Sequence, residues 1–410
     1  MSAGTLDRQD ERLNIGSGFR GELRSAAKSV RQGDIGSLPV IAGLIVVAIV
    51  FQTLNPVFLS SQNLVNLALQ STAIGVMAIG VVLVLLLAQI DLSIGSVNGF
   101  AAAILAVTFV QWQWPMWLAL LVPLAVGAAI GAIYGLLYIR FGVPSFVITL
   151  GGLMAFLGFQ LWSLGLNGSI NIPFDSFIVR FTQASFLPDV VAYVLVAAIA
   201  VGYGASALRS AHRRARQNLS SASATGIYLR GALILVGLGA LTWYMNTTRG
   251  VPVMFVLFLV LVAATGYALK RTRWGRAIYA IGGNEEAARR AGIHVSRVYM
   301  SVFVLSSFLA ALGGLLAAGR LASANPSSGG GTTNLEAIAA AVIGGTSLFG
   351  GRGTASSAIL GILVIESITN GLTLLNMDTS IRYIITGAVL LVAVVIDAIS
   401  RKSRAAHGRA

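Results

Sequence analysis

The chain contains no cysteine and little charge. Without cysteine, disulfide bonds and thiolate metal sites are excluded. Charged residues make up 10% of the 410 residues, against about 25% in a typical soluble domain. The three histidines, His212, His294 and His407, lie far apart in polar segments. The sequence therefore does not indicate an ordinary soluble domain, and it predicts no metal site.

Lysine is scarce as well. The only lysines are Lys28, Lys270 and Lys402, which follow alanine, leucine and arginine. A P-loop needs a lysine that follows glycine and precedes serine or threonine. ATP binding through that motif is therefore excluded, and we expect the chain to have no cofactor and no enzymatic activity of its own.

What the chain has is apolar sequence and glycine. Apolar residues make up 56% of it, and it contains 47 glycines, which membrane helices tolerate and use for close packing. Many apolar runs approach the roughly 20 residues that a spanning helix needs. The predicted fold class is all-α, a polytopic integral membrane protein with about 10–12 transmembrane helices and at least one discontinuous span. The candidate spans are 38–54, 66–88, 93–110, 115–139, 144–165, 189–207, 228–245, 251–269, 298–318, the short 335–349, 355–374 and 381–398.

Positive charge predicts how these helices cross the membrane. With the N-terminus in the cytoplasm, 24 of the 28 Lys and Arg residues fall in cytoplasmic segments, as the positive-inside rule requires. Only Arg180, Arg249, Arg320 and Arg382 remain outside, so the net charge of +14 needs no nucleic acid to explain it. The predicted parts are a polar cytoplasmic tail (1–37), a membrane domain (38–398) with cytoplasmic loops at 208–227 and 270–297, and a basic cytoplasmic tail (399–410).

The charged segment 271–295 predicts a short but complete helix. Asn284 can cap its start, an acidic pair follows where the helix dipole favours negative charge, and a basic pair closes the last turn. Gly292 stands where a left-handed residue would end the helix. A helix of about two turns is marginal in water, so we expect it to dock on another protein. An ordinary solvated loop is the simpler alternative.

Glu286-Ala287-Ala288 followed by Gly292 resembles the coupling loop of ATP-binding-cassette (ABC) importer permeases. In that family the loop seats in a groove of a separate ATPase subunit and passes its movement to the membrane helices. The resemblance implies that 284–292 is a coupling helix and that a partner binds ATP. The implied coupling residues are Glu285, Glu286, Ala287, Ala288 and Gly292.

Residues 90–96 read Ile-Asp-Leu-Ser-Ile-Gly-Ser. The pattern predicts a tight break between two helices, capped by Asp91 or Ser93. It resembles a signature of monosaccharide permeases of the ribose and xylose branch. Gln89 stands where that family commonly has glycine, so we expect the local backbone to differ there.

Residues 142–152 read Gly-Val-Pro-Ser-Phe-Val-Ile-Thr-Leu-Gly-Gly and resemble a second signature of the same permeases. Ser145 and Thr149 are one turn apart on one helix face. Such hydroxyls usually join membrane helices, and binding a sugar is the alternative.

Residues 337–354 resemble a third signature almost residue for residue, and 322–331 before them read as a flexible outer loop. Glycines there allow a break or a close approach, and interrupted spans are where transporters bind substrate or bend. Close packing of small residues is the alternative. The predicted hinge residues are Gly344, Gly345, Gly350 and Gly351.

Glu366 lies in the middle of a span, with Asn370 one turn beyond. An intramembrane carboxylate indicates function by default, as an ion site or a sugar acceptor. We favour a packing or gating role, because no basic residue lies mid-span to pair with it. The candidate translocation-pathway residues are Asp91, Ser93, Ser96, Asn98, Ser145, Thr149, Gln160, Glu366 and Asn370.

The resemblance covers most of 66–398 and implies the permease subunit of a monosaccharide ABC importer in the cytoplasmic membrane. A basic insert at 209–216, flanked by an extra pair of spans, resembles the xylose-permease branch and favours a pentose. The implied partners are an ABC ATPase, an extracytoplasmic sugar-binding protein and a second permease copy in a homodimer. Two other functions stay open: an ion-driven secondary transporter that uses Asp91 and Glu366, and a non-transporting membrane scaffold.

Overall fold

The computed structural model describes residues 38–166, 168–217 and 223–406. The predicted tail 1–37, part of the basic loop and the last residues of the C-terminal tail lie outside the described residues. Within these ranges the chain is almost entirely helical, which confirms the all-α fold class. It forms two compact units, which are described separately.

One unit contains a helical hairpin, α9 (Asp189–Arg216) and α10 (Ala224–Asn246), whose helices pack on each other. Ser223 caps α10 by accepting the N–H of Gly226 at 3.1 Å. Many of its large apolar side chains are exposed, as expected for helices that face lipid. The predicted loop 208–227 is helical as far as Arg216, because α9 runs on beyond its apolar part.

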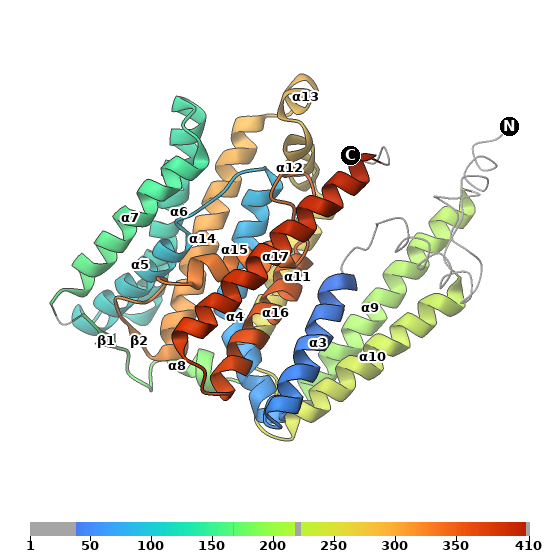
Figure 1. Ribbon diagram of the computed structural model, residues 1–410, viewed down its shortest axis with the longest axis horizontal. Coiled ribbons are helices and arrows are strands. Elements are labelled where there is room, and N and C mark those ends of the chain that lie inside the picture. Colours follow the sequence, from blue (N-terminus) through green and yellow to red (C-terminus); the bar gives the residue numbers. More distant parts are fainter. Residues whose placement is uncertain (1–37, 167, 218–222, 407–410) are drawn as a thin grey trace. The chain divides into compact units, whose positions relative to one another are not determined.

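The other unit is a larger helical bundle (Figure 1). Its helices are α3 (Leu38–Leu54), α4 (Ser61–Leu86), α5 (Ile94–Ala106) with the π-helical turn η1 (Val107–Gln111), α6 (Met116–Phe141), α7 (Ser145–Leu164), α8 (Phe177–Val179) with the π-helical turn η2 (Arg180–Ala184), α11 (Val253–Arg271), α12 (Arg273–Gly283), α13 (Glu285–Arg290), α14 (Val295–Leu321), α15 (Thr333–Ile343), α16 (Ser356–Leu374) and most of α17 (Thr379–Ala406). In Figure 1, α13 lies at one end of this bundle, and the strands β1 (Ile170–Asn171) and β2 (Ser323–Ala324) lie at the other.

Helix α14 is the centre of the bundle and packs against α4, α5 and α6. α4 and α14 are buried along most of their length, whereas α6, α7 and α11 expose an apolar outer face. That division follows from the sequence, because outer helices meet lipid on one side and can stay apolar there.

Nine helices in the described ranges are long and apolar enough to cross a membrane. α15 is different, because its 11 residues extend about 16 Å and the hydrocarbon core is about 30 Å thick. The short candidate span 335–349 is therefore a short helix followed by a turn, and it is the discontinuous segment that the sequence predicts.

The segment 322–331 is not the flexible loop that its composition suggests. β2 pairs antiparallel with β1, with Ile170 opposite Ala324. The Asn325 side chain accepts the N–H of Ser327 at 3.0 Å, so the turn that follows is also tied. The glycine-rich composition gives no sign of the long-range pairing with β1.

Candidate functional site

The predicted coupling helix is present as α13 and is closed at both ends. Asn284 Oδ1 accepts the N–H of Ala287 at 2.9 Å. Gly292 takes a left-handed conformation, with φ +82°. The N–H of Ile293 donates to the carbonyl of Ala288 at 3.1 Å, which completes a Schellman motif. The predicted cap and the predicted left-handed glycine are both confirmed, as is the helix itself.

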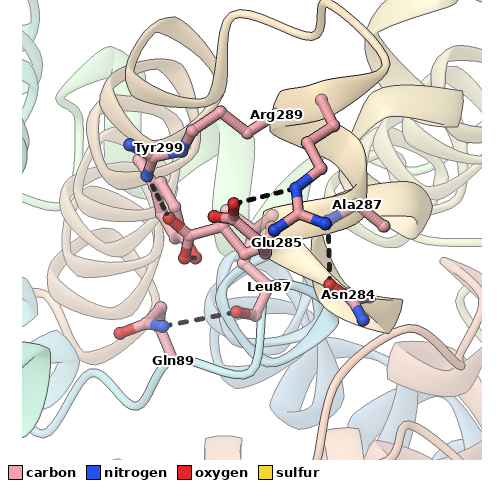
Figure 2. Close-up of polar contacts among 9 residues, drawn as sticks. Leu87, Gln89, Asn284, Glu285, Ala287, Arg289 and Tyr299 are labelled. Carbon is pink, nitrogen blue, oxygen red and sulfur yellow. Dashed lines mark hydrogen bonds and ion pairs between the residues drawn. The ribbon is translucent and has the colours of Figure 1, made fainter.

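Glu285 attaches α13 to the bundle. Its carboxylate pairs with Arg289 at 2.7 Å and accepts the hydroxyl of Tyr299 at 3.0 Å (Figure 2). The second acid, Glu286, pairs with Arg290 at 3.1 Å on the exposed side, and exposed pairs contribute only about 0–1 kcal/mol. Glu285 therefore holds the helix in place, while Glu286 stands on a surface that a partner can reach.

Helix α12 is not predicted from the sequence, which was interpreted as a polar loop over 271–283. Thr272 begins it, because its hydroxyl accepts the N–H of Gly275 at 3.1 Å. Ile278 and Ile281 are buried beneath the helix. A capping threonine followed by apolar residues three apart was the available signal.

α12 lies directly on the backbone of two other segments. Tyr279 donates its hydroxyl to the carbonyl of Gly353 at 2.8 Å. Burial raises the pKa of Tyr279 further above neutral pH. The N–H of Gly351 donates to the carbonyl of Leu86 at 2.9 Å. A Cβ on Gly282 would meet both of these groups. We call this meeting point of Leu86, Gly282 and Gly351 the glycine junction.

The turn after α15 is built from the four predicted hinge glycines. Gly345, Gly350 and Gly351 have φ of +100°, +82° and +70°, a region that favours glycine. Gly344 is the last residue before the turn, and a Cβ there would meet the carbonyl of Ser357. The geometry explains the glycines as turn and contact residues, and their role as a hinge stays a prediction.

The predicted break between α4 and α5 is present as the non-helical segment 87–93. Asp91 stabilises it, because one carboxylate oxygen accepts the N–H and the hydroxyl of Ser93 at 2.9 and 2.8 Å. This bond lies before the first residue of α5, so the helix cap predicted from Asp91 or Ser93 is not made. Ser93 itself makes no side-chain cap, and Ser96 donates to its carbonyl at 2.9 Å. Within the break, Ala88 has a left-handed backbone conformation, with φ +57°. The side chain of the next residue, Gln89, donates to the carbonyl of Leu87 (Figure 2).

Two hydroxyls of α7 hold this break in place. Ser145 Oγ accepts the N–H of Ile90 at 3.3 Å, and Thr149 Oγ1 accepts the N–H of Leu92 at 3.1 Å. Both side chains are buried. The structural alternative for these residues is therefore favoured, because their lone pairs are already directed at protein backbone.

The two interrupted helices, α5 and α15, meet inside the bundle. Asn334 near the start of α15 donates to the carbonyl of Leu92 at 2.8 Å. Beside them is a cavity of about 140 Å³ between α4, α5, α14 and the loop before α15. Its polar lining consists of Gln70, Asn98, Arg320, Asn325, Ser327, Ser328 and Thr333. Asn98 is the one candidate pathway residue that lines it in the described chain.

Gln160 and Asn370 support the cavity without lining it. Gln160 Nε2 donates to the carbonyls of Asn325 and Ser328, both at 2.9 Å, and so holds the loop that forms one wall. Asn370 Nδ2 donates to Gln70 Oε1 at 3.2 Å and so orients a lining residue. Both are buried and act through other residues.

Glu366 has a basic neighbour, contrary to the sequence interpretation. It is buried and interacts electrostatically with Arg320 and Glu336. Arg320 belongs to the last turn of α14, a position that the charge pattern placed outside the membrane. Residues of different helices come together here by packing, which a count of charges along the chain does not reveal.

A helical bundle with interrupted helices around a polar cavity, and a capped helix projecting from one end, is the architecture of a membrane transport permease. The chain belongs to the family described as "Branched-chain amino acid transport system / permease component", whose model matches residues 63–394.

Three relatives with names show how this chain compares. It is 36% identical over 365 residues to the xylose transport system permease protein XylH of Escherichia coli (strain K12), covering 88% of this chain and 92% of that one. The XylH protein of Haemophilus influenzae is 34% identical over 367 residues, covering 88% and 96%. The ribose import permease protein RbsC of Escherichia coli (strain K12) is 32% identical over 359 residues, covering 87% and 92%. No solved structure matches the chain.

Proposed function

We propose that this chain is the transmembrane subunit of an ATP-driven importer for a monosaccharide, with a pentose such as xylose as the first candidate. The names of the relatives support a sugar, although the family description mentions branched-chain amino acids. ATP is bound by a separate subunit, and the chain itself needs no cofactor. A sugar-binding protein and a second copy of the permease complete the importer in the cytoplasmic membrane.

The observation that carries this proposal is the construction of α13. The helix buries Ala288 and leaves most of its surface exposed. A helix so short is unstable alone, yet both ends are capped and Glu285 is bonded to Tyr299. A rigid, exposed helix is a surface that an ATPase groove can push against. With α13 in the cytoplasm, both termini are cytoplasmic as well, in agreement with the positive charge pattern.

The glycine junction supplies a route for the movement. Contacts between backbones leave no flexible side chain to absorb a displacement of α12, so α4 and the turn after α15 must follow it. α14 supplies a second route, because Tyr299 contacts α13 and Arg320 lines the cavity. The two residues are about 32 Å apart along one helix. Tilting of these helices then opens the cavity to alternate sides of the membrane.

The proposal is tested by purifying the tagged protein from its native membrane in a mild detergent and identifying what copurifies. We expect an ABC ATPase with the wild type and its loss with Glu286→Ala/Gly292→Ala. The control is Asp175→Ala, which removes an exposed carboxylate near β1, at the other end of the bundle. An ATPase that stays bound to the double variant would contradict docking on α13.

Measurements of uptake distinguish a sugar substrate from an amino-acid substrate. Membrane vesicles that contain the importer should accumulate labelled xylose or ribose when ATP is supplied, with or without a protonophore. Leucine should not accumulate. Leucine uptake in place of pentose uptake would move the proposal to the substrate in the family description, and protonophore-sensitive uptake without ATP would indicate a secondary transporter.

A further inference from the structure

We propose that Arg320 is a specificity-determining residue, whose guanidinium hydrogen-bonds sugar hydroxyls in the cavity between α4, α5 and α14. This inference rests on the proposed function as a sugar importer. It adds a named residue, outside every motif in the sequence, and a chemical role for the buried Glu366.

Arg320 is available for a ligand. It lines the cavity, and its Nε–H has no hydrogen-bond partner in the described part of the chain. The ion pairs found among the described residues both lie within α13, so Arg320 makes no direct pair that would occupy its donors. A buried donor without a partner costs about 1–3 kcal/mol. A sugar in the cavity can accept hydrogen bonds from the guanidinium of Arg320, whose side chain makes no hydrogen bond within the described residues.

Glu366 explains how the cation is tolerated. An arginine inside a membrane protein is costly unless a counter-charge lies near it. Glu366 of α16 interacts electrostatically with Arg320 but makes no direct ion pair with it within the described residues. The carboxylate therefore stabilises the guanidinium from a distance and leaves its planar set of N–H donors free.

The other polar groups that line the cavity suit a polyhydroxyl ligand. The other lining groups, which include Gln70, Asn98 and Ser327, offer both donors and acceptors. A sugar can satisfy such a set, because each of its hydroxyls can both donate and accept a hydrogen bond.

The test uses the complete importer in vesicles, with ATPase and sugar-binding protein, and compares Arg320→Gln with Arg180→Gln. Arg180 is an exposed arginine in η2, a turn that packs on the same helix α14, so this control removes the same charge nearby. ATP-driven flux is measured for xylose and for a series of xyloses that each lack one hydroxyl, all at saturating binding protein. Because the binding protein is the same throughout, a change in a flux ratio belongs to the permease.

We expect the wild type to move at least one deoxy sugar about tenfold more slowly than xylose, the effect of one hydrogen bond to a charged group. Arg320→Gln should slow xylose about tenfold and abolish that difference, whereas Arg180→Gln should keep both values. If Arg320→Gln does not reach the membrane, Arg320→Lys keeps a cation near Glu366 but lacks the planar fork, and the same comparison applies.

Two results overturn the inference and are distinguishable. If Arg320→Gln slows xylose and all deoxy sugars by the same factor, or slows none of them, Arg320 is structural and the importer proposal stands. If the wild type moves no pentose at all, the proposed function fails and the subsite fails with it.

Discussion

The hydroxyl of Tyr299 donates to the carboxylate of Glu285 at 3.0 Å, and this bond joins the helix that would meet an ATPase to the central helix of the bundle. Near its other end, α14 carries Arg320, which lines the polar cavity. One helix therefore contacts both the proposed ATPase-docking surface and the proposed sugar site. The glycine junction gives α12 a parallel connection to α4 and to the turn after α15.

The glycine junction should not tolerate a methyl group. In Gly282→Ala the new Cβ would overlap the carbonyl of Leu86 and the N–H of Gly351, and such overpacking costs about 1–3 kcal/mol. We expect a lower thermal unfolding midpoint in detergent and reduced transport. Gly283→Ala is the matched control, because no atom of the part of the chain that the structure describes lies within 4 Å of its new Cβ. Equal midpoints for the two variants would show that α12 does not press on this junction.

The cap of α13 should determine how rigid that helix is. Asn284→Ala removes the acceptor for the N–H of Ala287 and should cost about 1 kcal/mol of local stability. Hydrogen exchange over 285–292 should become faster and ATPase copurification weaker. Asn284→Ser retains a capping oxygen and should restore both. If Asn284→Ala leaves exchange unchanged, the remaining contacts of α13 suffice.

Gln160 should hold the wall of the cavity. Gln160→Leu keeps the size of the side chain but removes the donors to the carbonyls of Asn325 and Ser328. Each lost hydrogen bond contributes about 0.5–1.5 kcal/mol, so exchange over 325–331 should rise. The control is Gln113→Leu, because Gln113 is exposed and, among the described residues, its side chain bonds only the nearby carbonyl of Val110. Unchanged exchange in Gln160→Leu would mean that the β1–β2 pair alone holds the loop.

Asp91 distinguishes the importer from an ion-driven transporter. Asp91→Asn keeps an oxygen that can accept the N–H and hydroxyl of Ser93, and its new amide can donate to the nearby Ser306 hydroxyl. We therefore expect Asp91→Asn to retain most ATP-driven uptake, whereas Asp91→Ala, which leaves two buried donors unpaired, should lose it. Full loss in Asp91→Asn, together with protonophore sensitivity, would assign an ion to this carboxylate.

Local features could be predicted from the sequence because the groups that form them are close together along the chain. The caps of α13 and the break at Asp91 depend on residues within a few positions of one another, and both predictions are confirmed. α12 is equally local, but its capping residue Thr272 lies among charged residues that favour a polar loop. The class of protein followed from composition, since apolar runs of spanning length have few other uses.

Contacts between residues that are distant along the chain could not be predicted from the sequence. Ser145 and Thr149 were compatible with packing or sugar binding, and only the fold brings the 87–93 backbone to them. Arg320 was assigned to the outside because a charge count assumes that a residue at the end of a span meets water. In the fold, Arg320 is half-buried, lines the cavity and interacts electrostatically with Glu366.

The sequence by itself determined an all-helical membrane protein with a capped, exposed helix between two spans, because hydrophobic length and capping act over short distances along the chain. Only the tertiary structure decided which polar side chains hydrogen-bond to the protein backbone and which line the cavity. That choice depends on how helices far apart in sequence pack together, and the pattern of residues along one helix does not contain it.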